Sequence, residues 1–256
     1  MTKLLRKGIL RSIEILVFRG RSGIDNADEA LRYLPISDFI LRGEIDNPKV
    51  LEVGSGVKGI TPYIPFQITG VDVSFSGEIA KTLTPVCLSG AMLPFPDKSY
   101  DYVISVDMLE HVPESERAKI IMELLRVANK WVILAVPCGK LSEAHDKGLD
   151  ELYQQVKGER YHFFRDHIEN GLPAKEELVA CIRACAEKLG LSADIQVIGN
   201  VSLKARTFFM RLWITAKTPK VYNWISPFLC IFRRFLNYGD CYRQIFVVDI
   251  SRGERG

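Results

Sequence analysis

Three glycines and one acid have the types and spacing that could hold an adenosine-containing ligand. Gly54, Gly56 and Gly59 follow the apolar stretch 49–53 and fit the pattern G-x-G-x-x-G. Glycines allow a sharp turn and let a ligand approach the main chain closely. Asp72 ends the next apolar stretch, where a carboxylate can accept hydrogen bonds from both ribose hydroxyls. No Gly-Lys-Ser/Thr follows, which excludes a P-loop, but a nicotinamide or flavin oxidoreductase stays open.

These residues need a scaffold, and the apolar pattern predicts an α/β fold in which strands and helices alternate. Expected strands cover 49–53, 68–71, 85–88, 100–106, 131–137, 195–198 and 244–250, and expected helices cover 1–22, 28–42, 113–129 and 174–190. Near-continuous apolar strands separated by helices indicate a doubly wound, mostly parallel, Rossmann-like sheet. We expect a helical N-terminal segment, 1–45, before a domain, 46–256, with inserts at about 138–174 and 202–242.

Composition narrows the functional class. The chain has 256 residues, 47% of them hydrophobic, and a net charge of +3, which is too mild to argue for a nucleic-acid partner. Its six cysteines form no CxxC and suit a reducing, cytoplasmic setting. No uninterrupted apolar run of about 18 residues predicts a transmembrane helix. No tight set of His and Asp ligands is visible in the sequence, so no metal is expected.

The stretch 90–112, "GAMLPFPDKSYDYVISVDMLEHV", separates the alternatives. It resembles the class I S-adenosylmethionine-dependent methyltransferases that carry L-P-F-x-D-x-S-F/Y-D, then a strand, then L-E-H. With "VLEVGSGVKG" and "GVDVS", the resemblance extends over about 49–137. It implies a seven-stranded sheet with an antiparallel last strand. It also implies that the glycine loop wraps the methionine half of S-adenosylmethionine, a ligand without phosphate.

The resemblance assigns nine positions to the cofactor site: Glu52, Gly54, Ser55, Gly56, Asp72, Val73, Gly90, Ala91 and Asp107. In these relatives the loop residues line the methionine portion and the acid at Glu52 orders its end. Asp72 would bind the ribose, with Val73 beside the adenine, while Gly90 and Ala91 would edge that ring with backbone groups. Asp107 would face the methionine portion.

The sequence determines the methyl acceptor less well than the cofactor. A hydroxyl acceptor needs a base, and His111 at the rim of the sheet and His167 in the insert 138–174 are the candidates. That insert is expected to act as a lid over the acceptor. We expect O-methylation of a glycan, a lipid-linked sugar or a small molecule. The alternatives are an NAD(P)-binding oxidoreductase and a catalytically idle, methyltransferase-like scaffold associated with a membrane.

Two basic and aromatic segments suggest a further partner. Residues 1–22 and 217–238 combine Lys and Arg with apolar residues at helical spacing, and Arg233 and Arg234 belong to the second segment. Such segments suit an anionic membrane surface. The prediction is a cytoplasmic protein that can associate with the inner face of the membrane, and an oligomer is compatible with the same segments.

Overall fold

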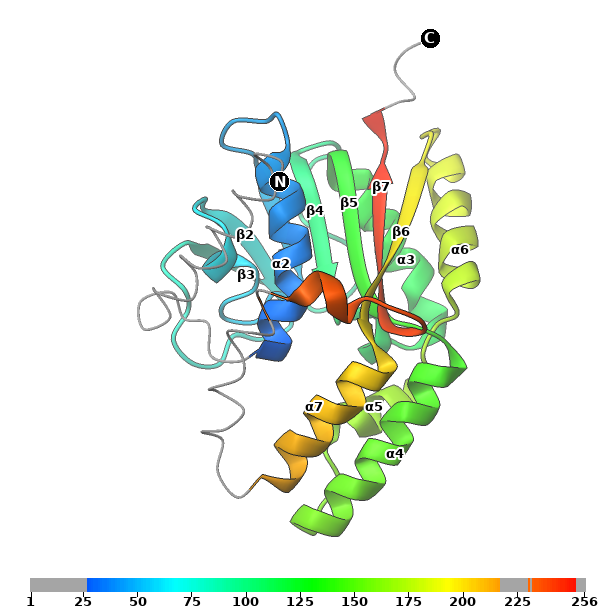
Figure 1. Cartoon of the computed structure of the whole chain (residues 1–256). Coiled ribbons are helices and arrows are strands. Elements are labelled where there is room, and N and C mark those ends of the chain that lie inside the picture. The colour runs from blue at the N-terminus through cyan, green and yellow to red at the C-terminus, as the bar shows by residue number, and fades with distance from the viewer. Residues whose placement is uncertain (1–26, 217–229, 231, 252–256) are drawn as a thin grey trace, which may run out of the picture.

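The centre of the molecule is a seven-stranded sheet, seen in a computed structural model that describes residues 27–216, 230 and 232–251 (Figure 1). The strands are β1 (Val50–Val53), β2 (Ile68–Asp72), β3 (Leu83–Cys87), β4 (Tyr100–Val106), β5 (Ala128–Pro137), β6 (Asp194–Ser202) and β7 (Cys241–Asp249). Their order is β3-β2-β1-β4-β5-β7-β6. Only β7 pairs antiparallel with its neighbours, so the expected parallel sheet with an antiparallel last strand is confirmed.

Helices cover both faces of this sheet. The α-helices are α2 (Ala27–Arg42), α3 (Glu114–Val127), α4 (Gly139–Lys157), α5 (His162–Asn170), α6 (Lys175–Lys188) and α7 (Leu203–Thr215). Helix α2 packs on one face of the sheet, where Leu34 and Ile40 join the core around Tyr102. Helices α3 and α6 cover the other face through Leu124 and Ile182. The central strands β1, β4 and β5 are thereby enclosed between two apolar layers, which explains their near-continuous hydrophobic sequences.

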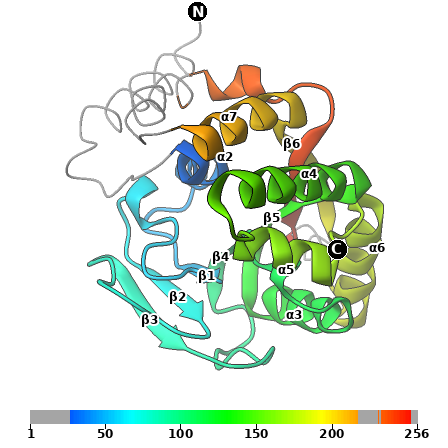
Figure 2. The same cartoon turned by 90° about the horizontal axis from the view of Figure 1, so that it is seen from below.

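Helices α4, α5 and α7 form a helical cap at the end of the sheet where the parallel strands finish (Figures 1 and 2). Helices α4 and α5 belong to the insert 138–174, and α7 opens the insert 202–242. Leu149, Phe164 and Ile214, one from each helix, make a small apolar core of their own. Ligands of doubly wound sheets bind outside the carboxyl ends of the strands. The cap therefore stands over the expected site.

Several boundaries differ from the sequence-based prediction. Strand β6 runs on to Ser202 because it pairs with β7 along its whole length. The segment after the glycine loop forms only a short 3-10 helix, η1 (Thr61–Tyr63), in keeping with its prolines. The expected helix 1–22 and residues 217–229 lie outside the described part of the chain. Within that part, every helix is too short or too polar to cross a bilayer.

The interpretation of Arg233 as a membrane-facing cation is wrong. This residue lies in the 3-10 helix η3 (Arg233–Leu236) and is buried. Its guanidinium donates to the Asp38 carboxylate of α2 at 2.6 Å. An arginine in a buried ion pair cannot reach a lipid headgroup. Its neighbour Arg234 is exposed.

Candidate functional site

The glycine loop lies on a buried carboxylate. Glu52, at the end of β1, is fully buried beneath the loop and accepts hydrogen bonds from the Tyr33 hydroxyl at 2.8 Å and the Ile60 amide at 2.7 Å. Burial is the main cause that raises the pKa of Glu52 to about 8, and the two hydrogen bonds oppose it. A Cβ on Gly59 would collide with this carboxylate, so Gly59 has to be glycine. Glu52 thus supports the loop from below and does not line a cavity.

The other residues of the glycine loop form hydrogen bonds with one another and with Asp72. Ser55 is buried, with its hydroxyl on the Gly56 carbonyl at 3.0 Å. The Gly56 amide donates to Asp72 at 2.8 Å, and the Val73 amide donates to the other oxygen of the same carboxylate at 2.7 Å. Gly54 adopts a positive φ of 82° and has Met108 directly beside it. Asp72 is therefore held by the loop, and each of its oxygens keeps a lone pair for a ligand.

A cavity of about 570 Å³ opens between this loop and α3. Its lining includes Gly54, Asp72, Val73, Gly90, Ala91 and Asp107 from the predicted cofactor positions. Leu88, Leu93 and Leu124 supply an apolar wall. Six of the nine positions that the resemblance assigned thus surround one cavity, and Glu52, Ser55 and Gly56 stand behind the loop. The volume lies within the range of about 300–1,000 Å³ that is usual for small-molecule sites.

A second cavity, of about 290 Å³, lies under the helical cap. Its walls combine aromatic side chains with charged ones: Asp28, Arg32, Asp107, Glu110, His111, Tyr161, Phe163, Phe164, His167, Arg206, Met210, Trp213, Tyr242 and Arg243. Asp107, His111 and Phe163 line both cavities. A ligand in the first cavity and one in the second would meet at these three residues.

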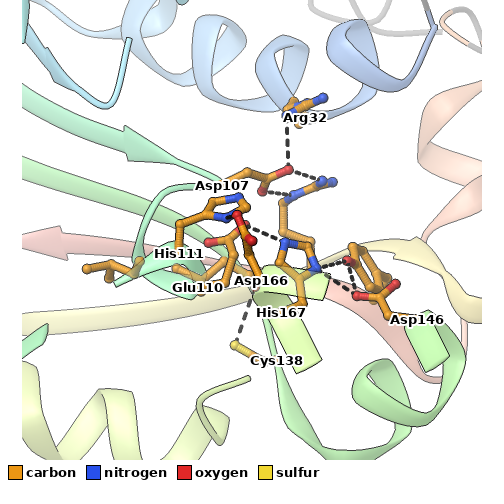
Figure 3. A network of polar contacts seen from close by, with 12 residues as sticks. Arg32, Asp107, Glu110, His111, Cys138, Asp146, Asp166 and His167 are labelled. Atoms are coloured by element: carbon orange, nitrogen blue, oxygen red, sulfur yellow. Dashed lines mark hydrogen bonds and ion pairs between the residues drawn. The ribbon is translucent and has the colours of Figure 1, made fainter. Parts of the chain in front are cut away.

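Asp107 is fixed at this junction by two arginines from opposite ends of the chain (Figure 3). It follows β4 with a positive φ of 49°. The Arg243 guanidinium on β7 donates to both of its oxygens at 2.5 Å, and Arg32 on α2 donates at 3.2 Å. Burial alone would raise the pKa of Asp107, but Arg243 and Arg32 outweigh it and lower the pKa. The carboxylate is therefore ionised and held rigidly in place.

His167 is oriented by a buried carboxylate. Its Nδ1 lies 2.9 Å from Asp146 on α4, which also accepts from the Tyr242 hydroxyl at 2.7 Å and from Arg206 at 2.8 Å. Burial opposes ionisation of Asp146, but Arg206 and the hydrogen bonds hold its pKa well below the usual range. An ionised carboxylate only accepts, so Nδ1 of His167 carries the proton. The lone pair of Nε2 is left facing the cavity.

His111 has a similar arrangement from the other side. Its Nδ1 lies 3.3 Å from Asp166 on α5, and its ring centroid is 5.0 Å from that of His167. Burial and the nearby His167 lower the pKa of His111, which favours the neutral ring. The structure thus brings the two predicted catalytic histidines together. His162, four residues before Asp166 on α5, is exposed.

Glu110 is the feature of this site that sequence reasoning overlooked. It follows Leu109 in the 3-10 helix η2 (Leu109–His111), and it is completely buried. Neither carboxylate oxygen has a hydrogen-bond partner among the described residues. Burial, followed by the charge of Asp107, raises the pKa of Glu110 well above its usual range. The available signal was an acid directly before a histidine at the end of a buried strand.

The comparisons with known proteins agree with this geometry. Residues 51–136 match the family model described as a methyltransferase domain. No curated protein is found to match the sequence. An S-adenosylmethionine-dependent methyltransferase of Thermotoga maritima is similar in structure, with 13% identity, a TM-score of 0.51 and coverage of 87% of this chain and 92% of the other. Magnesium protoporphyrin IX methyltransferase of Synechocystis PCC 6803, with bound S-adenosylhomocysteine, gives 18% identity, a TM-score of 0.51 and coverage of 85% and 81%.

The fold is that of the class I methyltransferases, with the ligand cavity at the carboxyl ends of the parallel strands. Residues 51–136 match a methyltransferase domain, and together with the fold this supports a methyltransferase whose cofactor is S-adenosylmethionine. This match favours methyl transfer over the oxidoreductase alternative.

Proposed function

We propose that this enzyme transfers a methyl group to a hydroxyl oxygen of a compact, polar acceptor. The main observation in support of this proposal is the wall that the two cavities share, formed by Asp107, His111 and Phe163. Two histidines, each beside a carboxylate, face the acceptor side of that wall. An oxygen nucleophile has to lose its proton during the reaction, and groups of this kind can assist that loss. A neutral amine acceptor would not need them.

The larger cavity suits the cofactor in shape and chemistry. Its apolar wall, including Leu88 and Leu93, fits an adenine, and the two remaining lone pairs on Asp72 fit the ribose hydroxyls. Gly54 lines this cavity without a side chain, so the methionine portion could approach the main chain there. When bound, S-adenosylmethionine supplies an electrophilic methyl group on a sulfonium, which the protein has to align with the acceptor. Asp107 is the one acid from the predicted cofactor set that reaches the acceptor side.

The smaller cavity limits the acceptor. A volume of about 290 Å³ suits a single ring or a terminal sugar. Tyr161, Phe163 and Trp213 offer flat faces for such a ring, and Arg206 stands among the polar groups. The proposed acceptor is a small hydroxylated molecule or the terminal sugar of a glycan or lipid-linked glycan. The cap helices α4 and α5 act as its lid.

The first test measures cofactor binding. Asp72→Ala removes the acceptor of the ribose hydroxyls, so the affinity for S-adenosylhomocysteine should fall about 10- to 100-fold in calorimetry, equivalent to about 1.5–3 kcal/mol. Asp240→Ala, at an exposed carboxylate before β7, is the matched control. Equal affinity in both variants would remove Asp72 from the site. No cofactor binding by the wild type would favour the idle scaffold.

The second test measures the acceptor. The enzyme is incubated with methyl-labelled S-adenosylmethionine and matched pairs of compact hydroxyl and amine compounds, including monosaccharides. Label transferred to oxygen supports the proposal. Label transferred to nitrogen alone would contradict it.

An anionic membrane surface is also a proposed partner, supported by aromatic side chains on the described surface. Phe208, Phe232 and Phe235 are 62%, 52% and 77% exposed. Aromatic residues beside basic ones suit the lipid interface. Cosedimentation with anionic vesicles should weaken with salt and with Arg234→Glu, and should be absent with neutral vesicles. Equal sedimentation with and without anionic vesicles would refute this partner.

A further inference from the structure

The cluster of Glu110, His111 and His167 is built like a metal site. Each residue offers one ligand atom, and these atoms lie within 4.8 Å of one another. Nε2 of His167 and Oε1 of Glu110 are 4.0 Å apart. Figure 3 shows the carboxylate of Glu110 beside the two imidazoles. Ligands of a tetrahedral ion with bonds of about 2.0–2.2 Å lie roughly 3.4 Å apart, so the ligand atoms would have to approach one another by at most about 1.4 Å.

The buried carboxylate of Glu110 is the second and independent observation. Its exposure is 0%, and neither oxygen accepts a hydrogen bond from the described residues. A buried acid without partners is costly, and buried charges in native proteins are normally paired or bound to a metal. Nothing in the methyltransferase site described above uses this group. A cation between the three side chains would satisfy it.

The surroundings of the two histidines complete the pattern. In metal sites, a histidine ligand typically gives its second nitrogen to a carboxylate, which fixes the ring and strengthens the ligand. His167 has Asp146 at 2.9 Å from Nδ1, and His111 has Asp166 at 3.3 Å from Nδ1. In both rings this leaves Nε2 as the nitrogen available to an ion. Two unrelated histidines would not both need this arrangement.

Positive charge near the cluster is already neutralised. Arg243 is bound to Asp107 through two hydrogen bonds, and Arg206 is bound to Asp146. These carboxylates offset the arginines that would otherwise repel a cation. The site can therefore accept a divalent ion without a large electrostatic cost.

We propose that Glu110, His111 and His167 bind a divalent transition-metal ion of the zinc class on the wall of the acceptor cavity. Two imidazoles and one carboxylate favour such an ion over Mg²⁺ or Ca²⁺, which prefer oxygen ligands. Three protein ligands leave a position open towards the cavity. This role rests on the proposed O-methylation: the hydroxyl oxygen of the acceptor would bind the ion, and the ion would take the place of the histidines as the group that activates it. The ion would lower the pKa of that hydroxyl, so that its proton leaves to water before the oxygen accepts the methyl group.

The experiment uses the full chain, stripped of metal with a chelator, and contains neither cofactor nor acceptor. Calorimetry with Zn²⁺ should show one equivalent bound, and Co²⁺ should give visible absorption at the same stoichiometry. Glu110→Gln, which keeps the size of the side chain, should weaken Zn²⁺ binding by about 100-fold or more. Asp166→Asn, at a partly exposed position behind His111, should weaken it by about 10-fold.

His162→Ala is the matched control, because this histidine is on α5 like His167 but is exposed. Its Zn²⁺ affinity should stay within about twofold of the wild type. The proposal is overturned if the wild type binds no stoichiometric Zn²⁺, or if Glu110→Gln binds as the wild type does. Failure here leaves methyl transfer to a hydroxyl untouched, and failure of that transfer leaves the metal titration valid.

Discussion

Replacing Glu52 with glutamine should change how stability depends on pH. In the wild type, one oxygen of this carboxyl group accepts from Tyr33 and the other from Ile60, and the group is fully buried. Burial raises its pKa to about 8, from an ordinary value of 4.5. Glutamine has the same size, its oxygen can accept from Ile60, and its amide can donate to the Tyr33 oxygen. It therefore imitates the protonated acid and cannot ionise.

The sign and size follow from the two pKa values. The folded state keeps the proton up to about pH 8, whereas the unfolded chain loses it near 4.5. The wild type therefore has the full contribution of this group below about pH 4.5 and loses it as the pH rises through 8. Each pH unit between those values is worth about 1.4 kcal/mol, so between pH 5 and pH 8 the free energy of unfolding should fall by on the order of 4 kcal/mol. The variant should lack this decline.

Urea unfolding of both proteins at pH 5, 6, 7 and 8 measures the effect. The difference in unfolding free energy, variant minus wild type, should increase with pH. In melting temperature, 4 kcal/mol corresponds to roughly 8–16 °C for a domain of this size. Glu44→Gln, at an exposed position, controls for the substitution itself. Parallel pH profiles for wild type and Glu52→Gln would show that the buried acid is ionised in the folded state, and the reasoning would be refuted.

Two further predictions concern stability. Gly59→Ala should destabilise the fold more than Gly56→Ala in urea unfolding. Both glycines have a positive φ, which costs an alanine about 1–2 kcal/mol, but only a Cβ at Gly59 would meet the carboxylate of Glu52 beneath the loop. Equal losses of stability in the two variants would contradict this. Arg233→Ala should lower the free energy of unfolding by about 2 kcal/mol, since it removes the buried partner of Asp38 and leaves that carboxylate only the more distant Arg42, at 3.8 Å. Arg234→Ala should change it by less than about 0.5 kcal/mol, and the reverse order would contradict the buried ion pair.

The sequence predicted the centre of the sheet well because the central strands are buried on both faces. Strand β4, Tyr100–Val106, was predicted with the observed bounds, since a short apolar run between turn residues is typical of a buried strand. Strand β6 was predicted too short because it lies at the edge of the sheet and alternates between exposed and half-buried residues before it turns inward at Asn200. The local sequence pattern of β6 carries little information about its pairing with β7, which lies some forty residues further along the chain.

The candidate site was predictable only where a motif lies within one segment. Gly54 and Asp72 were found because a loop and a strand end carry their own sequence signal. The acceptor side was found only in part, because Glu110, Asp146 and Arg243 come from three distant elements and meet only in the folded chain. A charged residue inside the apolar strand β7 was the available hint.

The clamp on Asp107 has a consequence for the order of events during synthesis. Arg32 comes from the first described helix and Arg243 from the last strand, which lies between β5 and β6 in the sheet. As the ribosome releases the chain, the strands from β1 to β6 emerge before the strand that has to insert between two of them. Until that insertion, the junction of the two cavities lacks its clamp, even though the glycine loop and Asp72 are already made. Catalytic competence is therefore acquired last, and a chain that stops before residue 241 would carry the cofactor motifs without a finished reaction centre.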